Sequence, residues 1–76
     1  MEARVVRDLT SSPSLSPREL DVIRLVAEGR TNEQIARQLG VSLSTVKAEL
    51  SALFATLGAT DRASAVAVCF RRGLLR

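Results

Sequence analysis

The sequence is short of the residues on which metal sites and disulfide frameworks depend. It contains no histidine and a single cysteine, Cys69. One cysteine excludes an internal disulfide, and the absence of histidine disfavours a zinc site. We therefore expect a reduced protein that binds no metal and no other cofactor, in which Cys69 is a small buried or half-buried hydrophobic residue.

Signals for membranes, export and catalysis are missing as well. No apolar run approaches the length of about 18 residues that a membrane span needs, and the N-terminal stretch MEARVVRDL lacks the apolar centre of a signal peptide. The sequence also lacks a catalytic histidine, a constellation of paired carboxylates and a nucleotide-binding loop. These absences predict a cytoplasmic protein that spans no membrane and is not an enzyme.

Aromatic residues are scarce, at 3% of the chain, although apolar residues make up 46%. Leucine, valine, isoleucine and alanine must therefore fill the core of the single domain that 76 residues allow. Eleven basic and eight acidic residues leave a net charge of +3. This mildly basic balance permits a nucleic-acid partner without requiring one.

Residues 31–57 predict two helices joined by a tight turn. Thr31 is a good N-cap, and Gln34 can answer it in a capping box. Gly40 ends the first helix, because glycine takes the left-handed conformation without a steric penalty, and Ser42 caps the second. The apolar residues of the second helix share one side: Val46, Leu50, Leu53, Phe54 and Leu57. A short helix, a turn and a longer helix form a helix-turn-helix, which offers its second helix to the DNA major groove.

A further helix is predicted ahead of this pair, within residues 15–29. Ser16 is its N-cap, Pro17 suits the first helical position, and Glu19 closes a second capping box. Its inward residues are Val22, Ile23 and Val26, with Leu25 partly buried. The charged residues of this helix form a solvated face, or alternatively Arg18 and Glu19 brace the neighbouring helices.

The last predicted helix runs from about residue 62 to residue 72. Asp61 is its N-cap, and Gly73 ends it. Its apolar residues cover more than the one side that packing needs: Ala63, Ala65, Val66, Ala67, Val68, Cys69 and Phe70. The surplus predicts a surface for a partner. The alternative is that an alanine-rich helix is simply tolerated in water.

Residues 1–14 have the composition of a linker, with mixed charge followed by Thr-Ser-Ser-Pro-Ser. We expect them to form a flexible N-terminal tail or the end of a linker from a regulatory domain. Residues 15–76 are expected to form the folded domain.

Five stretches of sequence occur in a fixed order: LSPRELDVI, EGRTNEQIARQL, VSLSTVK, LGATDRASAV and a final GLL. Together they resemble the LuxR/FixJ (GerE-type) DNA-binding domain across residues 15–75. Region 4 of sigma factors shares the first three stretches but not the fourth, so it is the weaker match. The resemblance implies an all-α fold, a four-helix domain of the LuxR helix-turn-helix type.

The same resemblance implies a bacterial transcriptional regulator, usually the output domain of a response regulator or of a ligand-sensing protein. Its partners would be double-stranded DNA, read by residues 43–57 in the major groove, a second copy of the chain, and RNA polymerase as a further candidate. Family base contacts map onto Lys47, Ala48 and Ser51. Family contacts to the DNA backbone map onto Thr31, Asn32, Thr45, Glu49 and Thr56. For the homodimer, the outward side of the last helix offers Ala63, Ala67, Phe70 and Arg71.

Helical geometry agrees with this map. At about 100° per residue, Ser44 joins Lys47, Ala48 and Ser51 on one side of the second helix, away from the apolar side. Lys47 can donate to a guanine, and Ala48 can touch a thymine methyl group. The alternative for Lys47 is an ordinary solvated lysine.

Two positions depart from the family pattern: Glu49 stands where members commonly carry histidine, and Thr56 where they carry a basic residue. Lys47 and Glu49 are the only charged residues of this helix, which is therefore net neutral. A carboxylate near phosphate is unfavourable, so we expect Glu49 to limit DNA affinity unless it pairs with an arginine such as Arg37 or Arg62. The alternative function is a LuxR-like dimerisation or protein-interaction module with weak or lost DNA binding.

Overall fold

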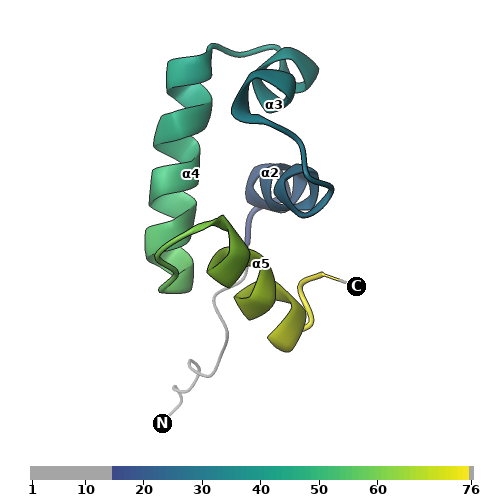
Figure 1. Cartoon of the computed structure of the whole chain (residues 1–76), viewed down its shortest axis with the longest axis vertical. Coiled ribbons are helices and arrows are strands. Elements are labelled where there is room, and N and C mark those ends of the chain that lie inside the picture. Colours follow the sequence, from purple (N-terminus) through teal and green to yellow (C-terminus); the bar gives the residue numbers. More distant parts are fainter. Residues whose placement is uncertain (1–14, 76) are drawn as a thin grey trace, which may run out of the picture.

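The computed structural model describes residues 15–75, which form four α-helices and, within that range, no strand. The helices are α2 (Pro17–Ala27), α3 (Asn32–Leu39), α4 (Leu43–Leu57) and α5 (Arg62–Arg71). In Figure 1, α4 runs along one side of the molecule, with α3 near its N-terminal end and α5 near its C-terminal end. The predicted all-α, four-helix fold is confirmed. The tail predicted for residues 1–14 lies outside the described residues.

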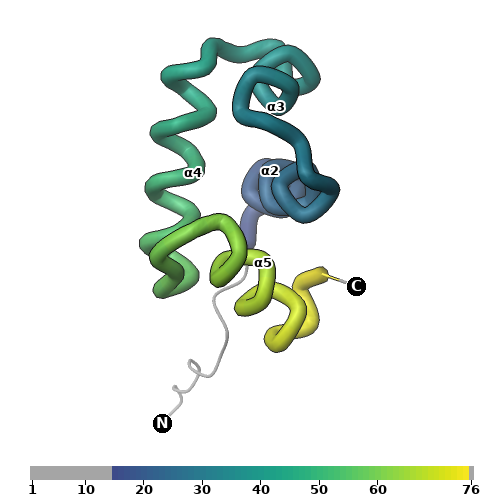
Figure 2. Tube along the Cα trace, in the orientation of Figure 1, coloured from purple at the N-terminus to yellow at the C-terminus, as the bar shows by residue number. Residues whose placement is uncertain are grey.

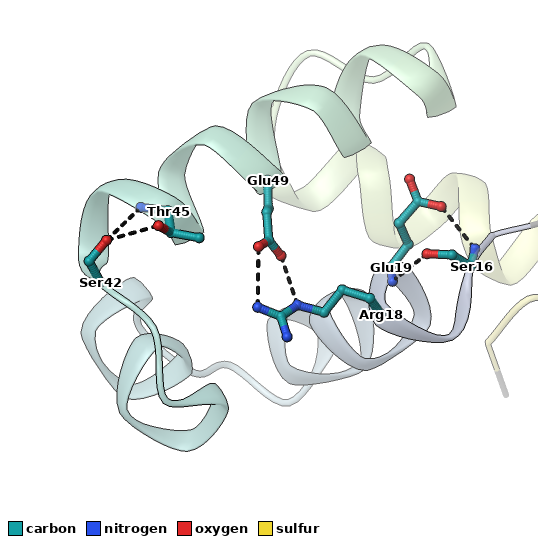
Figure 3. Close-up of polar contacts among 6 residues, drawn as sticks. All are labelled: Ser16, Arg18, Glu19, Ser42, Thr45 and Glu49. Atoms are coloured by element: carbon teal, nitrogen blue, oxygen red, sulfur yellow. Dashed lines mark hydrogen bonds and ion pairs between the residues drawn. The ribbon is translucent and has the colours of Figure 1, made fainter.

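Reciprocal side-chain caps start the first two helices. The Ser16 hydroxyl accepts from the backbone N–H of Glu19 at 3.1 Å, and the Glu19 carboxylate accepts from the backbone N–H of Ser16 at 2.9 Å (Figure 3). Thr31 and Gln34 make the same pair of hydrogen bonds at the start of α3. Both predicted capping boxes are therefore confirmed.

The other two helix starts are capped as well. The Ser42 hydroxyl accepts from the backbone N–H of Thr45 at 3.1 Å, and the Asp61 carboxylate accepts from the backbone N–H of Ser64 at 2.8 Å. The Ser64 hydroxyl accepts in return from the backbone N–H of Asp61 at 3.2 Å. Helix α5 thus begins with a capping box that the sequence analysis missed, because the usual residue in the third position is Glu or Gln.

Glycines end the two helices of the helix-turn-helix. Gly40 after α3 has φ 70°, and Gly58 after α4 has φ 69°. At both positions a left-handed backbone, which only glycine adopts without strain, makes the turn possible. The boundaries of the outer helices differ slightly from the prediction. Helix α2 ends at Ala27 rather than near 29, and α5 ends at Arg71 rather than 72.

Apolar residues of all four helices form one core, in which Cys69 is completely buried. Leu25 is buried, and not partly buried as predicted. Phe54 is only half-buried although it was predicted with the apolar side of α4. It lies about 20° round the helix from Lys47, at the edge of that side, which explains its partial exposure.

Helix α2 lies in the middle of the domain and packs against α3, α4 and α5. The Cα trace in Figure 2 shows the other three helices arranged around it. Helix α3 also packs on α4, and α4 packs on α5. One side of α4 and one side of α5 are left exposed, with no described helix covering them.

Across residues 15–75, no single helix is long and apolar enough to cross a membrane. Helices α4 and α5 meet the length and composition requirements only when they are taken together. They are bent by 49° at the break between them.

Candidate nucleic-acid interface

The exposed side of α4 is termed here the reading face and consists of Ser44, Lys47, Ala48, Ser51 and Ala55. The opposite side of the helix is buried: Val46, Leu50, Leu53 and Leu57. The structure therefore brings the four predicted base-contacting residues together on one side of one helix. Because these side chains are small apart from one lysine, the helix backbone can approach a groove closely.

At the start of α4, hydroxyl groups hydrogen-bond one another. Ser42 Oγ donates to Thr45 Oγ1 at 2.9 Å (Figure 3), and the Oγ atoms of Ser42 and Ser44 lie 3.1 Å apart. Since Thr45 Oγ1 accepts from Ser42, the Thr45 hydroxyl keeps its own proton for a further partner. Thr45 is exposed, so the predicted contact to the DNA backbone has a donor available.

Thr56 lies on the same flank of α4 and is exposed, but its hydroxyl is already used. It donates to the backbone carbonyl of Ala52 at 3.0 Å, one turn earlier in the same helix. A phosphate oxygen accepts hydrogen bonds and donates none. Thr56 therefore reaches the predicted flank without the free donor that a phosphate contact requires.

Glu49 pairs with Arg18 of α2. Arg18 Nε donates to Glu49 Oε1 at 2.9 Å, and Nη2 donates to Oε2 at 3.2 Å (Figure 3). The hydrogen bond with Glu49 is the main cause of a raised Arg18 pKa. The alternative that Glu49 pairs with an arginine is therefore confirmed, but the partner is Arg18 and not Arg37 or Arg62. Arg18 does brace a neighbouring helix, as one alternative held, but Glu19 serves the cap of α2 instead.

The start of α3 is held by Arg62 of α5. Arg62 Nη1 donates to Asn32 Oδ1 at 2.7 Å, and Nη2 donates to the backbone carbonyl of Arg30 at 2.7 Å. Because Asn32 Oδ1 accepts from Arg62, the amide nitrogen of Asn32 is the group left for another partner. The exposed Thr31 hydroxyl accepts from the Gln34 backbone N–H and also keeps its own proton.

Sequence reasoning named Thr31 and Asn32 but missed the role of Arg62. The contact between Arg62 and Asn32 joins residues 30 positions apart, and no local sequence pattern predicts it. Arg18 and Glu49 are likewise 31 positions apart. Both contacts depend on how the helices cross, which the periodicity of a single helix does not reveal.

The four predicted dimer residues are exposed together on the outward side of α5: Ala63, Ala67, Phe70 and Arg71. The inward side of α5 is buried: Ala65, Val68 and Cys69. Phe70 is 48% exposed and is the one large apolar side chain so exposed within residues 15–75. Burial raises the pKa of the Cys69 thiol, which therefore remains protonated and acts as a core residue.

A helix-turn-helix whose second helix shows a small, uncovered polar side is characteristic of proteins that insert that helix into the DNA major groove. The family comparison agrees with this class. The model for bacterial regulatory proteins of the luxR family matches residues 13–69. The chain belongs to this family, as its five sequence stretches predict.

Related proteins are longer than this chain. A candidate HTH-type transcriptional regulator of Mycobacterium bovis is 47% identical over 60 residues, which is 79% of this chain but 7% of the relative. The response regulator ChrA of a heme-sensing two-component system has a TM-score of 0.78 and 29% identity, over 91% of this chain and 34% of ChrA. VqmA of Vibrio cholera, solved with ligand and DNA, has a TM-score of 0.75 and 27% identity, over 92% of this chain and 31% of VqmA. The chain thus spans about a third or less of each of these relatives.

Proposed function

We propose that this chain binds double-stranded DNA sequence-specifically, as the helix-turn-helix domain of a bacterial transcriptional regulator, with α4 in the major groove. The observation that carries the proposal is the reading face, a row of small exposed side chains along a 15-residue helix. The proposed base contacts are Lys47, Ala48, Ser51 and Ser44. VqmA, a structural relative solved in complex with DNA, supports the same use of the fold.

The proposed contacts to the DNA backbone lie beside the reading face. Within the described residues 15–75, Thr31, Asn32 and Thr45 each retain a donor that makes no hydrogen bond, so phosphate oxygens can accept from them. The Thr56 hydroxyl already donates to the backbone carbonyl of Ala52, so Thr56 contributes less to phosphate binding. Glu49 approaches the backbone as one half of an ion pair and not as an isolated carboxylate.

We further propose a homodimer through the outward side of α5, which would present two reading faces to two half-sites. RNA polymerase as an additional partner, a cytoplasmic location and the absence of enzymatic activity belong to the same proposal, because each accompanies the role of a transcriptional regulator.

Selection of bound sequences from a random pool of duplexes tests the proposed function. We expect one short motif to be enriched, repeated as inverted or direct half-sites. Affinity for the selected duplex should fall linearly when log K is plotted against log salt concentration. A pool from which no motif emerges would contradict sequence-specific binding, and retention of no duplex at low salt would contradict DNA binding altogether.

The charge of α4 favours a second candidate, a LuxR-like protein-interaction module that no longer reads DNA. Lys47 and Glu49 are the only charged residues of α4, so the helix contributes no net attraction to phosphate. The exposed Phe70 would then serve a protein partner. A mobility-shift titration at low salt separates the two candidates, because the interaction module would leave the duplex unshifted.

A further inference from the structure

The ion pair between α2 and α4 leaves part of the Arg18 side chain unused. A guanidinium group has five N–H donors, and Glu49 accepts one from Nε and one from Nη2. Figure 3 shows the third nitrogen of the Arg18 guanidinium, Nη1, directed away from the Glu49 carboxylate. The Arg18 side chain is 44% exposed, against 32% for Glu49. Three donors on this guanidinium make no hydrogen bond within residues 15–75 and therefore remain for a partner from solution.

The position of the pair relates it to the proposed DNA interface. Counted from Lys47, Glu49 lies about 200° round α4, close to Thr45 at about 160° and Thr56 at about 180°. This flank, formed by Thr45, Glu49 and Thr56, would face the sugar–phosphate backbone when the reading face enters the major groove. Arg18 comes to the flank from α2, a helix outside the helix-turn-helix.

A carboxylate alone on this flank would repel phosphate, but a carboxylate that holds an arginine has a different effect. In the pair, the positive charge of Arg18 balances the negative charge of Glu49, and the carboxylate fixes the orientation of the flexible Arg18 side chain. Guanidinium groups suit phosphate oxygens in both charge and geometry. We propose that Arg18 donates a hydrogen bond to a DNA phosphate and that Glu49 is the positioning residue that aims it. This inference rests on the proposed DNA binding.

The test measures affinity against salt concentration for the duplex selected with the wild-type protein. Arg18→Gln removes the proposed phosphate contact, so log K should depend less steeply on log salt, by about 0.9. Between about 50 and about 200 mM salt, the loss of affinity should then be about 3.5-fold smaller than in the wild type. Arg24→Gln is the matched control, because it removes one exposed arginine from α2 outside this flank and should keep the wild-type slope.

Glu49→Gln gives the sharper result, because repulsion by Glu49 and positioning by Glu49 predict opposite changes in DNA affinity. Simple repulsion predicts tighter binding once the negative charge is removed. Positioning predicts weaker binding to every duplex and a slope that moves toward that of Arg18→Gln, even though the net charge rises by one. Since both residues would act through one contact, the double variant should bind no more weakly than Arg18→Gln alone.

The salt titrations are interpreted together with a check on folding. Circular dichroism and thermal unfolding establish that each variant is folded, and the two single variants test the inference independently. A wild-type slope for Arg18→Gln overturns the phosphate contact, and tighter binding by Glu49→Gln overturns the positioning role of Glu49, while in both cases the DNA-binding function stands. If the wild-type protein binds no duplex at any salt concentration, the proposed function fails and the inference fails with it.

Discussion

Lys47 is the one cation on the reading face of α4, where its neighbours Ala48 and Ser51 are small. Its side chain therefore has room to reach a base edge in the major groove. We expect Lys47→Ala to cost about 1–3 kcal/mol of binding free energy on the selected duplex and to relax the preference at one base position. Titrations against the selected duplex and its single-base variants measure both effects.

The matched control for Lys47 is Arg24→Ala, which removes an exposed cation from α2 away from the reading face. It should leave the sequence preference unaltered. An equal loss of affinity on every duplex would make Lys47 a phosphate contact, and no loss on any duplex would make it an ordinary solvated lysine.

The Asp61 cap at the start of α5 makes the stability of the fold depend on pH. The backbone N–H of Ser64 donates to its carboxylate at 2.8 Å, and this hydrogen bond is the main reason that the pKa of Asp61 lies below its ordinary value of 3.8. Ionised Asp61 therefore stabilises the fold when the pH is above 3.8. This contribution is lost as the pH falls through the lowered pKa. Asp61→Asn keeps a cap that does not titrate.

We expect Asp61→Asn to lose less thermal stability than the wild type as the pH falls below 3.8 and through the lowered pKa of Asp61. Asp21→Asn, on the exposed side of α2, reports the effect of removing a carboxylate elsewhere. Melting temperatures that fall in parallel for the wild type and Asp61→Asn would contradict the prediction.

At the scale of the helices, local signals in the sequence predict most of the fold. The caps at Ser16, Thr31, Ser42 and Asp61 each act within three residues, so the start of every described helix is confirmed. The reading face follows in the same way from helical periodicity. What the sequence does not predict is the partner of a side chain on another helix. The pairs Arg18–Glu49 and Arg62–Asn32 depend on helix crossings, which arise only when the core is packed.

Arg62 joins two helices that do not otherwise meet. Within the described chain, α3 and α5 do not pack against each other, so the hydrogen bonds from Arg62 to Asn32 and to the Arg30 carbonyl form their direct link. Arg62→Ala should lower the free energy of unfolding by about 1–3 kcal/mol, because a part-buried charged hydrogen bond to Asn32 and an exposed one to the Arg30 carbonyl are lost. It should also weaken binding to every duplex alike, because the start of α3 is no longer held. Chemical denaturation and duplex titration measure these effects.

Arg37→Ala is a suitable control for Arg62, because it removes an exposed arginine from α3 itself. Its unfolding free energy should stay close to that of the wild type. Combining Arg62→Ala with Asn32→Ala tests the contact directly, since the two losses should not add if they remove one interaction. Fully additive losses, or an unchanged denaturation midpoint for Arg62→Ala, would show that the contact between Arg62 and Asn32 does not contribute to the free energy of unfolding.

At the scale of the whole molecule, the proposal gives the two exposed helix sides separate tasks. The reading face belongs to α4, and the outward side of α5 lies on another helix that begins after the turn at Gly58 (Figure 1). A partner on α5 can therefore bind without covering the reading face. Ala63, Ala67 and Phe70 follow one another at helical spacing on that side. This arrangement suits two copies of the chain that pair through α5 while both read DNA.

We expect this pairing to be weak in solution, because one 10-residue helix offers little area for an interface. A duplex with two half-sites should complete it, since binding of the first protomer raises the effective concentration of the second. Sedimentation should show mostly monomer alone and two protomers on the two-half-site duplex. Phe70→Ala should reduce the cooperativity of that binding, yet it should bind a duplex with a single half-site as the wild type does, because the exposed Phe70 is outside the reading face. One protomer on the two-half-site duplex at saturating protein would rule the dimer out, and an equal loss on both duplexes would place Phe70 in the fold or in the DNA contact instead.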